Sequence, residues 1–487
     1  MSSIAAFMLN NFAVEYDPDT VYPEHPPFNP KENYPEYKFG ATSVKGNAVY
    51  DQVRRVLINM GLDETNFGNP SWNPFGEFVN PGSKVVIKPN WVREMNPVNS
   101  DISGLVTHPS VLRAVIDYVL IALREKGEII IGDAPIQSAD FGLLMSALGI
   151  NELLDFYAGK TSVKISVEDF RKEIKVYSPD GDIKFQETRD DVLFTEVNLA
   201  GNSYLSEIEN KFRKFRVTNY NPDLMQKYHG PGKNIYLIAR PVLEADVVIQ
   251  LPKLKTHRKA GITCCMKNTV GINSAKDALV HHIKGSKTSG GDAYPGLNLL
   301  KSLNEYFYEF REKTGNGRMR RIMTSLISIN DGIMKRTGMN RFFEGSWYGN
   351  STLWRMMLDI NNILFFVDHE GRLREEVQRK VFYLVDGITG GERDGPLKPD
   401  NRQAGIIIGT FNPVAGDMVA ASLIGFDYKK ITAIRKALEN NFLGMEMDRV
   451  PEMTISYNGD KIGFVDLPSV ARFEPAAGWK NHIEKEN

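Results

Sequence analysis

The alternation of short apolar runs with helical segments constrains the fold of this chain most. Residues 84–90, Lys-Val-Val-Ile-Lys-Pro-Asn, form an apolar run stopped by proline, which predicts a buried strand followed by a loop. Apolar residues then recur at helical spacing over 109–126, and Pro109 suits a first helical turn. A second buried strand, Ile129–Ile131, ends in the Gly-Asp-Ala-Pro turn at 132–135. A strand, a helix and a strand at this spacing predict a βαβ unit and hence a parallel sheet.

The rest of the chain extends this pattern. Residues 160–235 alternate in β fashion around Ser178–Asp182, whose Ser-Pro-Asp-Gly-Asp sequence is typical of a hairpin turn. We therefore expect an inserted antiparallel flap. The parallel pattern resumes at 245–251. Beyond it we expect strands at 322–329, 381–385 and 404–409 and helices at 351–366, 413–424 and 428–440.

The length of the chain bears on the number of domains. Its 487 residues exceed what one compact core usually holds. We expect an α/β protein of two domains with mostly parallel sheets flanked by helices: a first domain over 41–300, carrying the insertion 160–235, and a second over 301–487. Residues 1–40 are rich in Pro, Asn, Tyr and Glu. They predict an extended arm that lies on the surface or reaches a neighbouring subunit of a homo-oligomer.

The charge balance and the cysteines exclude several classes of protein. Lys plus Arg is 59 and Asp plus Glu is 60, a formal net charge of −1, so we expect no nucleic-acid partner. No run approaches the roughly 18 apolar residues of a membrane span, and Ile4–Leu9 is too short for a signal sequence. Cys264 and Cys265 are adjacent, which provides neither a disulfide framework nor the ligands of an iron–sulfur cluster. A cytoplasmic protein is the simplest interpretation.

A concentrated cationic segment follows the strand predicted at 245–251. Between Asp246 and Asp277 there is no acidic residue, and six basic residues fall in this interval: Lys253, Lys255, Arg258, Lys259, Lys267 and Lys276. Ligands of open parallel sheets bind at the carboxyl ends of the strands, so this position favours a phosphate or carboxylate ligand. Thr256 and Asn268 of the same segment are further candidate ligand-binding residues. The alternative is a solvated basic loop.

Three histidines accompany this segment. His257 lies within it, and His281 and His282 follow soon after. Imidazoles beside an anion site favour proton transfer or metal binding. His257 is the candidate general acid or base, and His281 and His282 are candidate metal ligands.

Two other strand ends carry candidate site residues. Lys88 and Asn90 alternate about the proline that ends the first strand, and either bind a ligand or leave Lys88 in solvent. His108, just before the helix predicted at 109–126, either faces the same cleft as a catalytic residue or has a structural role at the helix N-terminus. Asp133, at the next strand end, orients a histidine or lysine or caps the following helix.

Two segments in the second half of the chain are further candidates. Arg393 lies in Gly391–Pro396, a glycine-rich loop of the kind that closes over a ligand. Residues 347–361 mix aromatic and polar side chains as carbohydrate or nucleobase sites do, and core packing of the aromatics is the alternative. The chain contains no Walker, Rossmann, nucleophile-elbow or HExxH pattern.

Several of these motifs together resemble the DUF362 family. They are Lys88-Pro89-Asn90, the turn at 132–135, the run from Asp246 to Gly271, Asp386-Gly387-Ile388, Gly395-Pro396 and the Pro-Val-Ala-Gly-Asp sequence at 413–417. The resemblance covers about residues 84–425 and implies no agreed activity. Many members have a ferredoxin-like cysteine module, which this chain lacks. Members similar to this chain in the Tyr-Gly-Asn and Trp-Arg segment imply a link to surface-polysaccharide pathways.

A more distant resemblance is to the lactate racemase family, whose cofactor is a nickel-pincer nucleotide. In that family a catalytic histidine lies ten residues before the lysine that holds the cofactor, as His257 lies before Lys267 here. The resemblance implies two α/β domains with the site between them, and His281 or His282 as nickel ligand. The glycine-rich stretch before the lysine is replaced here by Thr263–Met266.

We therefore expect an anionic small molecule in an interdomain cleft, for example one linked to a sugar or nucleotide, and an enzyme that works by proton transfer or isomerisation. Lys253, Lys255 and Lys267 would neutralise the ligand, and His257 would act as acid or base. The alternative is a non-catalytic binding protein or assembly factor, which needs the cations but not the histidines.

Overall fold

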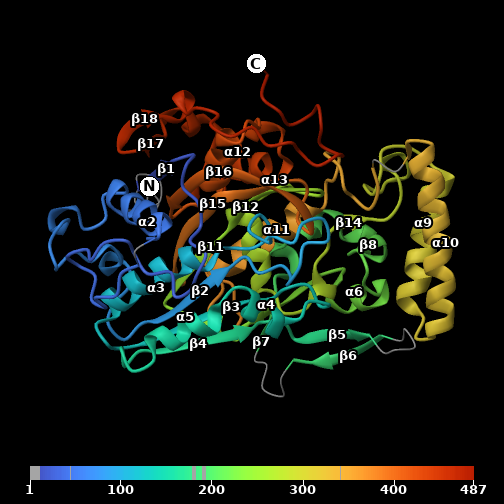
Figure 1. Cartoon of the computed structure of the whole chain (residues 1–487). Helices are drawn as coiled ribbons and strands as arrows, with labels where there is room; N and C mark the ends of the chain where they lie inside the picture. The colour runs from blue at the N-terminus through green and yellow to red at the C-terminus, as the bar shows by residue number, and fades with distance from the viewer. Residues whose placement is uncertain (1–10, 44, 178–182, 189–193, 340–341, 487) are drawn as a thin grey trace.

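The computed structural model describes residues 11–43, 45–177, 183–188, 194–339 and 342–486. Within these residues, 11 strands form one large sheet (Figure 1). Its order is β18-β17-β1-β16-β15-β11-β2-β3-β4, and β12 pairs with β13 and β15. The bounds are β1 Phe12–Tyr16, β2 Lys84–Pro89, β3 Glu128–Asp133, β4 Lys164–Asp169, β11 Val247–Leu251, β12 Lys253–His257, β13 Gly261–Thr263, β15 Lys380–Asp394, β16 Lys398–Thr410, β17 Thr454–Tyr457 and β18 Asp460–Gly463.

The parallel part of this sheet confirms the predicted βαβ unit. β2 and β3 pair in parallel, with Lys84 opposite Glu128, and α3 (Pro109–Leu123) connects them. β11 pairs in parallel with β2 on one side and with β15 on the other. β11 is buried along its whole length, as expected for a strand covered on both faces. The chain is thus an α/β protein with a mostly parallel large sheet.

Helices cover both faces of the sheet. Gly409 in β16 faces α2 (Ala48–Asn59), since a Cβ there would lie 2.5 Å from Val56, while the next residue, Thr410, lies beside Gly416 of α12 (Pro413–Leu423). Because successive strand residues point to opposite faces, α2 and α12 lie on opposite sides of β16. The other helices are α4 Phe141–Ala147, α5 Ile150–Tyr157, α6 Pro222–Tyr228, α7 Arg240–Glu244, α8 Cys265–Asn268, α9 Leu299–Lys313, α10 Gly317–Arg336, α11 Leu353–Phe366 and α13 Thr432–Glu439.

The predicted antiparallel insertion over 160–235 is present only in part. Its first strand, β4, instead pairs in parallel with β3 in the large sheet, and small antiparallel sheets follow. β5 and β6 pair with each other, and their predicted turn at 178–182 lies outside the described residues. β10 pairs antiparallel with both β7 and β9, and β14 pairs with β8. These strands are β5 Glu173–Tyr177, β6 Ile183–Glu187, β7 Phe194–Asn198, β8 Phe215–Arg216, β9 His229–Gly230, β10 Lys233–Ala239 and β14 His282–Ile283.

The N-terminal segment is not the surface arm that its composition suggested. β1 pairs antiparallel with β16 and parallel with β17 inside the large sheet. Phe12, Ala13 and Val14 are buried. Five residues of β1 precede the proline-rich stretch, and their apolar side chains are sufficient to add a strand. The predicted extended arm is therefore wrong for the residues of β1.

The strand predicted at 322–329 is also wrong. This segment lies inside α10, whose N-cap residue Asn316 accepts a hydrogen bond from the Met319 N–H. Asp331 and Gly332, which follow the predicted strand, lie inside the same helix. Periodicity alone does not distinguish a short apolar strand from a buried stretch of helix. The predicted helices at 351–366, 413–424 and 428–440 correspond to α11, α12 and α13, the last beginning at Thr432.

The large sheet joins the two halves of the chain. β11, from the predicted first domain, pairs directly with β15, from the predicted second domain. Buried apolar side chains from both halves, such as Val248 and Phe382, belong to one core. The boundary predicted near residue 300 therefore does not coincide with a break in the sheet.

Candidate functional site

A cavity of about 860 Å³ lies at the carboxyl ends of the central parallel strands. Asn90 follows β2, residues 133–136 end β3, and Lys255 and His257 come from β12. The turn from α8 into the following 3₁₀ segment contributes Lys267, Asn268 and Gly271. This is the edge at which open parallel sheets bind their ligands.

A buried ion pair supports the base of the cavity. Lys88 lies 2.9 Å from Asp133 and donates a hydrogen bond to Asn268. Asp133 also accepts a hydrogen bond from the Trp91 N–H. A Cβ at Gly271 would lie 2.1 Å from the Asp133 carboxylate, so only glycine fits against this pair. Lys88 and Asp133, both predicted as ligand-binding residues, thus neutralise each other, and Lys88 does not line the cavity.

Five lysines that line the cavity have no carboxylate partner among the described residues: Lys255, Lys259, Lys267, Lys276 and Lys398. Among the described residues, no Asp or Glu lies within ion-pair distance of Lys255, Lys267 or Lys276; Lys255 instead donates a hydrogen bond to Asn90, at 2.7 Å. Burial, together with nearby Lys88 and Lys259, lowers the pKa of Lys267 to about 8. Burial also lowers the pKa of Lys276 to about 7. Both ammonium groups therefore titrate near neutral pH, where a bound anion would hold them charged.

Hydrogen bonds fix the tautomer of His257. Its Nδ1 accepts from the backbone N–H groups of Lys259 and Ala260, at 3.0 and 3.1 Å. A neutral ring must then carry its proton on Nε2. Burial, and next the charge of Lys267, hold the pKa of His257 well below its usual value, so the ring is neutral. His257 therefore presents an N–H donor rather than a basic nitrogen.

His281 has the opposite tautomer. Its Nδ1 lies 2.7 Å from the carbonyl oxygen of Leu279, which requires a proton on Nδ1 and leaves a lone pair on Nε2. Burial and nearby Lys259 keep the pKa of His281 well below its usual value. His281 lines the cavity, whereas His282, the next residue along the chain, does not. Of the two predicted metal ligands, only His281 faces the cavity.

Lys253 and His108 belong to a separate cluster. Lys253 is fully buried, pairs with Asp386 at 2.9 Å and donates a hydrogen bond to the hydroxyl of Tyr22. The ring of Tyr22 stacks on His108 at 4.0 Å, and the Tyr22 hydroxyl donates to Asp386. His108 caps α3 by accepting a hydrogen bond from the Ser110 N–H. These residues do not line the cavity, and Tyr22 was absent from the sequence-based candidates.

Thr256 and Arg393 make contacts with other residues of the protein and do not line the cavity. The Thr256 hydroxyl donates to the carbonyl oxygen of Arg393, at 2.8 Å. The Arg393 side chain is exposed and pairs with Asp400 and Glu474. The predicted loop at 391–396 is mostly the tip of the β15–β16 hairpin, and Asp394, Pro396 and Lys398 from this tip line the cavity.

The part of the cavity wall that β5, α9 and α10 form was not predicted from the sequence. It includes Lys175 of β5 and Arg311, Glu312, Arg320 and Arg321 of α9 and α10. Glu312 lies within ion-pair distance of Lys175, Arg311 and Arg320. The Arg-Met-Arg-Arg sequence at 318–321 was the available signal, but the expected strand at 322–329 concealed that these arginines lie on a helix.

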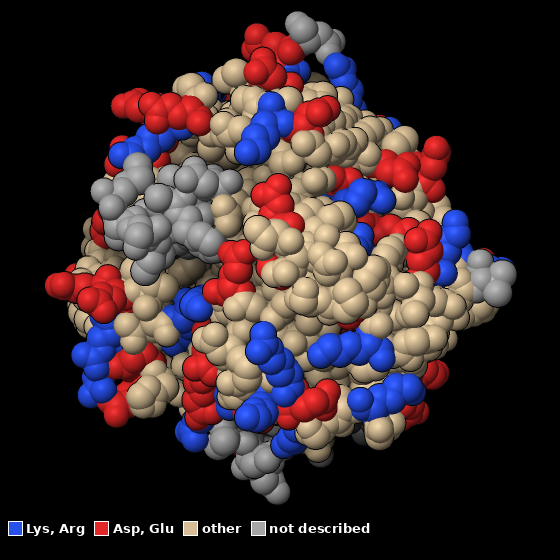
Figure 2. Space-filling model, turned by 90° about the vertical axis from the view of Figure 1, so that its left-hand side faces the viewer, with Lys and Arg blue, Asp and Glu red and all other residues tan. Residues whose placement is uncertain are grey.

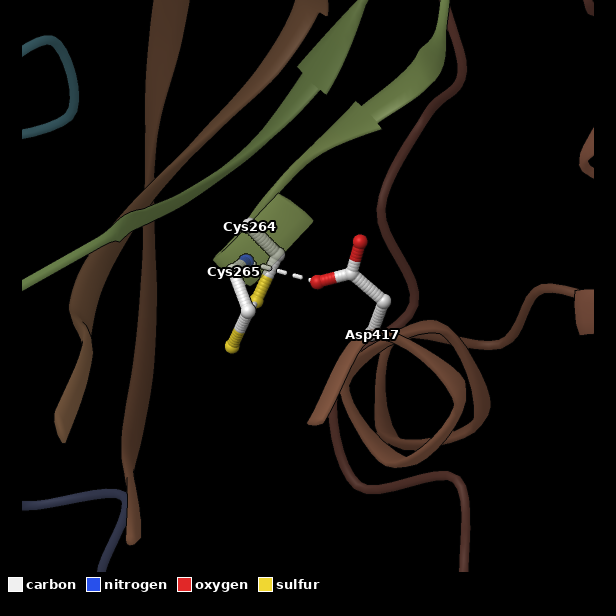
Figure 3. A group of neighbouring side chains, drawn as sticks. All are labelled: Cys264, Cys265 and Asp417. Carbon is white, nitrogen blue, oxygen red and sulfur yellow. Dashed lines mark hydrogen bonds between the residues drawn. The ribbon is translucent and has the colours of Figure 1, made fainter. Parts of the chain in front are cut away.

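A group of potential metal ligands lies where α8 begins and α12 passes it (Figure 3). Cys264, Cys265 and Asp417 are buried, with ligand atoms within 4.8 Å of one another, and could hold a thiophilic cation such as Zn²⁺. Burial raises the pKa of both thiols, and raises the pKa of Asp417 to about 7. Asp417 also accepts a hydrogen bond from the Cys265 N–H, at 2.6 Å, and so anchors the start of α8, which carries Lys267.

The sequence model of a family described as a domain of unknown function, DUF362, matches residues 85–192 and 202–422. The chain belongs to the DUF362 family. The segments matched to DUF362 contain Lys255, His257, Lys267, Lys276 and His281, which all face the cavity.

Curated proteins and solved structures add little to this assignment. No curated protein matches the chain. The chain is similar to a Thermotoga maritima protein whose crystal structure was a structural-genomics target, with 12% sequence identity and a TM-score of 0.32. The match covers 78% of this chain and 58% of that chain. This DUF362 protein thus spans less than two thirds of that protein's length.

Proposed function

We propose that this DUF362 protein binds an anionic small molecule in the cavity and acts on it by proton transfer. The observation that carries the proposal is the set of lysines, Lys255, Lys267 and Lys276 among them, which face one cavity without a carboxylate partner among the described residues. Ammonium groups left without a counter-ion in a partly desolvated site favour a phosphate or carboxylate ligand.

The size and walls of the cavity support a ligand larger than a free anion. About 860 Å³ lies within the range of sites for small organic ligands and cofactors. Arg320 and Arg321 also line the cavity, and Glu312 is the shared ion-pair partner of several cations there. We infer a substrate in which the anionic group is attached to a larger body, such as a sugar or a nucleotide.

The two histidines have complementary roles in the proposed reaction. The Nε2 lone pair of His281 takes a proton from a carbon next to the substrate's carbonyl or carboxylate group. The electron pair of that C–H bond moves onto the substrate oxygen, which accepts a hydrogen bond from the Nε2–H of His257. The lysines stabilise the added negative charge. Return of the proton from His281 to the former carbonyl carbon, while the proton of the adjacent substrate hydroxyl passes to the oxyanion, completes an isomerisation.

A second candidate is a DUF362 protein that binds the same anion without catalysis, for instance as an assembly factor in a surface-polysaccharide pathway. This function needs Lys255, Lys267 and Lys276 but neither His257 nor His281. Substitution of the histidines therefore distinguishes the two candidates.

A nickel-pincer nucleotide is an alternative form of the enzyme proposal, in which hydride transfer takes the place of proton transfer. Lys267 and the Nε2 lone pair of His281 face the same cavity, which gives an amine for attachment and a nitrogen ligand for nickel. Such a cofactor would supply a hydride acceptor. Intact mass of the denatured protein tests it: a retained mass increment that maps to Lys267 supports attachment, and an unmodified mass in nickel-loaded cells contradicts it.

The anion proposal is tested by ligand binding. We would screen phosphorylated and carboxylated sugars and nucleotides by thermal shift and measure the affinity of the best ligand by calorimetry. Lys267→Gln should weaken binding by about tenfold to a hundredfold, because a charge-assisted hydrogen bond contributes about 1.5–3 kcal/mol. Lys287→Gln, at an exposed lysine outside the cavity, is the matched control. Equal affinity of the Lys267→Gln variant and the control would overturn the proposed site.

A further inference from the structure

The hairpin of α9 and α10, residues 297–339, exposes an unusual number of apolar side chains. Of the 18 large apolar residues exposed in the described part of the chain, eight lie in this segment of less than a tenth of the sequence. Leu297 and Leu299 are 82% and 76% exposed, and Ile329 is 61% exposed. The two helices pack side by side at the right edge of the molecule in Figure 1. Exposed apolar patches of this extent mark interaction surfaces.

The exposed apolar residues lie at helical spacing. Leu299, Leu303, Tyr306 and Phe310 of α9 follow one another by four, three and four residues, which places them on one face. In α10, Ile322, Ile329 and Ile333 follow by seven and four residues, again on one face. Each helix therefore turns an apolar stripe toward solvent.

The opposite side of the hairpin is held to the body by ion pairs. Glu309 pairs with Arg216 and Lys284, and Glu312 pairs with Lys175. The acidic side chains of α9 thus face the body, and the apolar stripes face outward. This is the reverse of a hairpin that packs its apolar face on a core.

The charges of the hairpin are also distributed unevenly. Over residues 297–339, all of which the structure describes, five cations are exposed and none of the four acidic residues is. The exposed cations are Lys313, Arg318, Arg321, Lys335 and Arg336. By contrast, Figure 2 shows basic and acidic side chains interspersed over the face of the molecule at the left of Figure 1. Of these, Lys313 pairs with Asp223 of the body and Arg321 lines the cavity, so Arg318, Lys335 and Arg336 remain for the outer surface. The outer surface of the hairpin is therefore both apolar and basic.

We propose that the outer face of the α9–α10 hairpin docks on an anionic lipid bilayer. Amphipathic helices that combine apolar side chains with Lys and Arg lie in the membrane interface and bind anionic lipids. No helix in the described part of the chain is long and apolar enough to cross a bilayer, so docking would be peripheral. A second copy of the chain is disfavoured as the occupant, because it would bring two basic surfaces together. The inference does not depend on which ligand occupies the cavity.

Flotation of the full chain with vesicles tests this surface. We expect binding to vesicles of phosphatidylcholine with phosphatidylglycerol, little binding to phosphatidylcholine alone, and loss of binding at high salt. A double variant at the apolar stripes, Leu303→Ser with Ile329→Ser, and a charge variant, Arg318→Glu with Arg336→Glu, should each reduce vesicle binding at least tenfold. Val465→Ser and Lys461→Glu, exposed residues outside the hairpin, are matched controls and should bind as the wild type does.

The outcomes that overturn the proposal are distinct. Absence of wild-type binding to phosphatidylglycerol vesicles contradicts it, as does binding that neither hairpin variant reduces. Concentration-dependent dimerisation that the Leu303→Ser and Ile329→Ser variant abolishes would assign the surface to a second copy instead. Circular dichroism of each variant checks that it remains folded, and the two hairpin variants perturb different chemistry, so failure of one to fold leaves the other as a test.

Discussion

At the scale of single residues, the chemistry of the cavity depends on which ring nitrogens carry protons. Backbone N–H groups occupy Nδ1 of His257, and a backbone carbonyl binds Nδ1 of His281. Burial, and then the charges of nearby lysines, hold the pKa of both rings well below the usual value, so both stay neutral. The cavity therefore combines a neutral hydrogen-bond donor with a neutral base.

The first prediction concerns this pair. His281→Gln should slow exchange of the substrate's carbon-bound proton with solvent by about a hundredfold or more, because general-base catalysis typically contributes 10²–10⁴. Exchange into D₂O, followed by NMR on the ligand found in the screen, measures this. Ligand affinity should change little. His25→Gln, at an exposed histidine, is the control. Proton exchange that survives His281→Gln would contradict the role of His281 as the base, and absence of exchange with the wild-type protein would favour the non-catalytic candidate.

The second prediction is a pH dependence of anion binding. The pKa values of Lys276 and Lys267, about 7 and about 8, lie below that of a free lysine, so both lysines are charged below neutral pH and lose charge as pH rises through 7 and 8. Affinity for sulfate, whose own charge stays constant, should therefore fall between about pH 6 and pH 9. Calorimetry across this range measures it, and an affinity that is flat or rises with pH would contradict the assignment.

Some of these residues could be predicted from sequence and others could not. The cationic run after β11 predicted the positions of Lys255, His257 and Lys267 at a strand end. It could not separate Lys255 from Lys253, because both lie on one face of β12 and only long-range contacts with Asp386 and Asn90 distinguish them. The tautomers of His257 and His281 depend on backbone geometry that no sequence pattern reveals.

At the scale of elements, local patterns identified those with strong signals. β2, α3 and β3 follow from apolar runs and the proline at 109, and α11 and α12 from helical spacing. β1 and α10 were missed for a common reason. The apolar side chains of β1 pack against residues far away in the sequence, and several of those of α10 face solvent. In neither case does the local pattern decide between strand, helix and loop.

The third prediction concerns how α11 is fixed. Asp359 is fully buried and accepts hydrogen bonds from the Tyr204 N–H and from the hydroxyls of Ser203 and Tyr236. Asp359→Ala would leave these donors buried without an acceptor, which costs about 1–3 kcal/mol for each unsatisfied group. We expect urea unfolding to show a loss of about 3 kcal/mol. Asp19→Ala, at an exposed aspartate, should cost little, and a similar small loss for both variants would contradict this role of Asp359.

At the scale of the whole molecule, one sheet contains strands from both ends of the chain. β1 lies between β16 and β17, and β11 from the first half lies beside β15 from the second. Such pairings join residues hundreds of positions apart, and local sequence patterns contain no information on them. This is why the sequence predicted two sheets where the structure has a shared one.

The fourth prediction tests the place of β1 in this sheet. Val14 is fully buried, so Val14→Asp would place an unpaired charge in the core and should lower the free energy of unfolding by several kcal/mol. Val21→Asp, at a residue 64% exposed and only a few positions away, should have little effect. Urea denaturation of both variants measures the difference. Equal stability of the two variants would support the surface arm that composition suggested.

The central claim, that the lysine-lined cavity is an anion site, is tested most directly by locating a bound anion. Crystals grown without phosphate or sulfate and soaked in tungstate, a heavy tetrahedral oxyanion, would show its position by anomalous scattering. We predict a peak in the cavity within hydrogen-bond distance of Lys267 and of Lys255 or Lys276. Tungstate bound only at other surfaces, with the cavity empty of it, would contradict the claim.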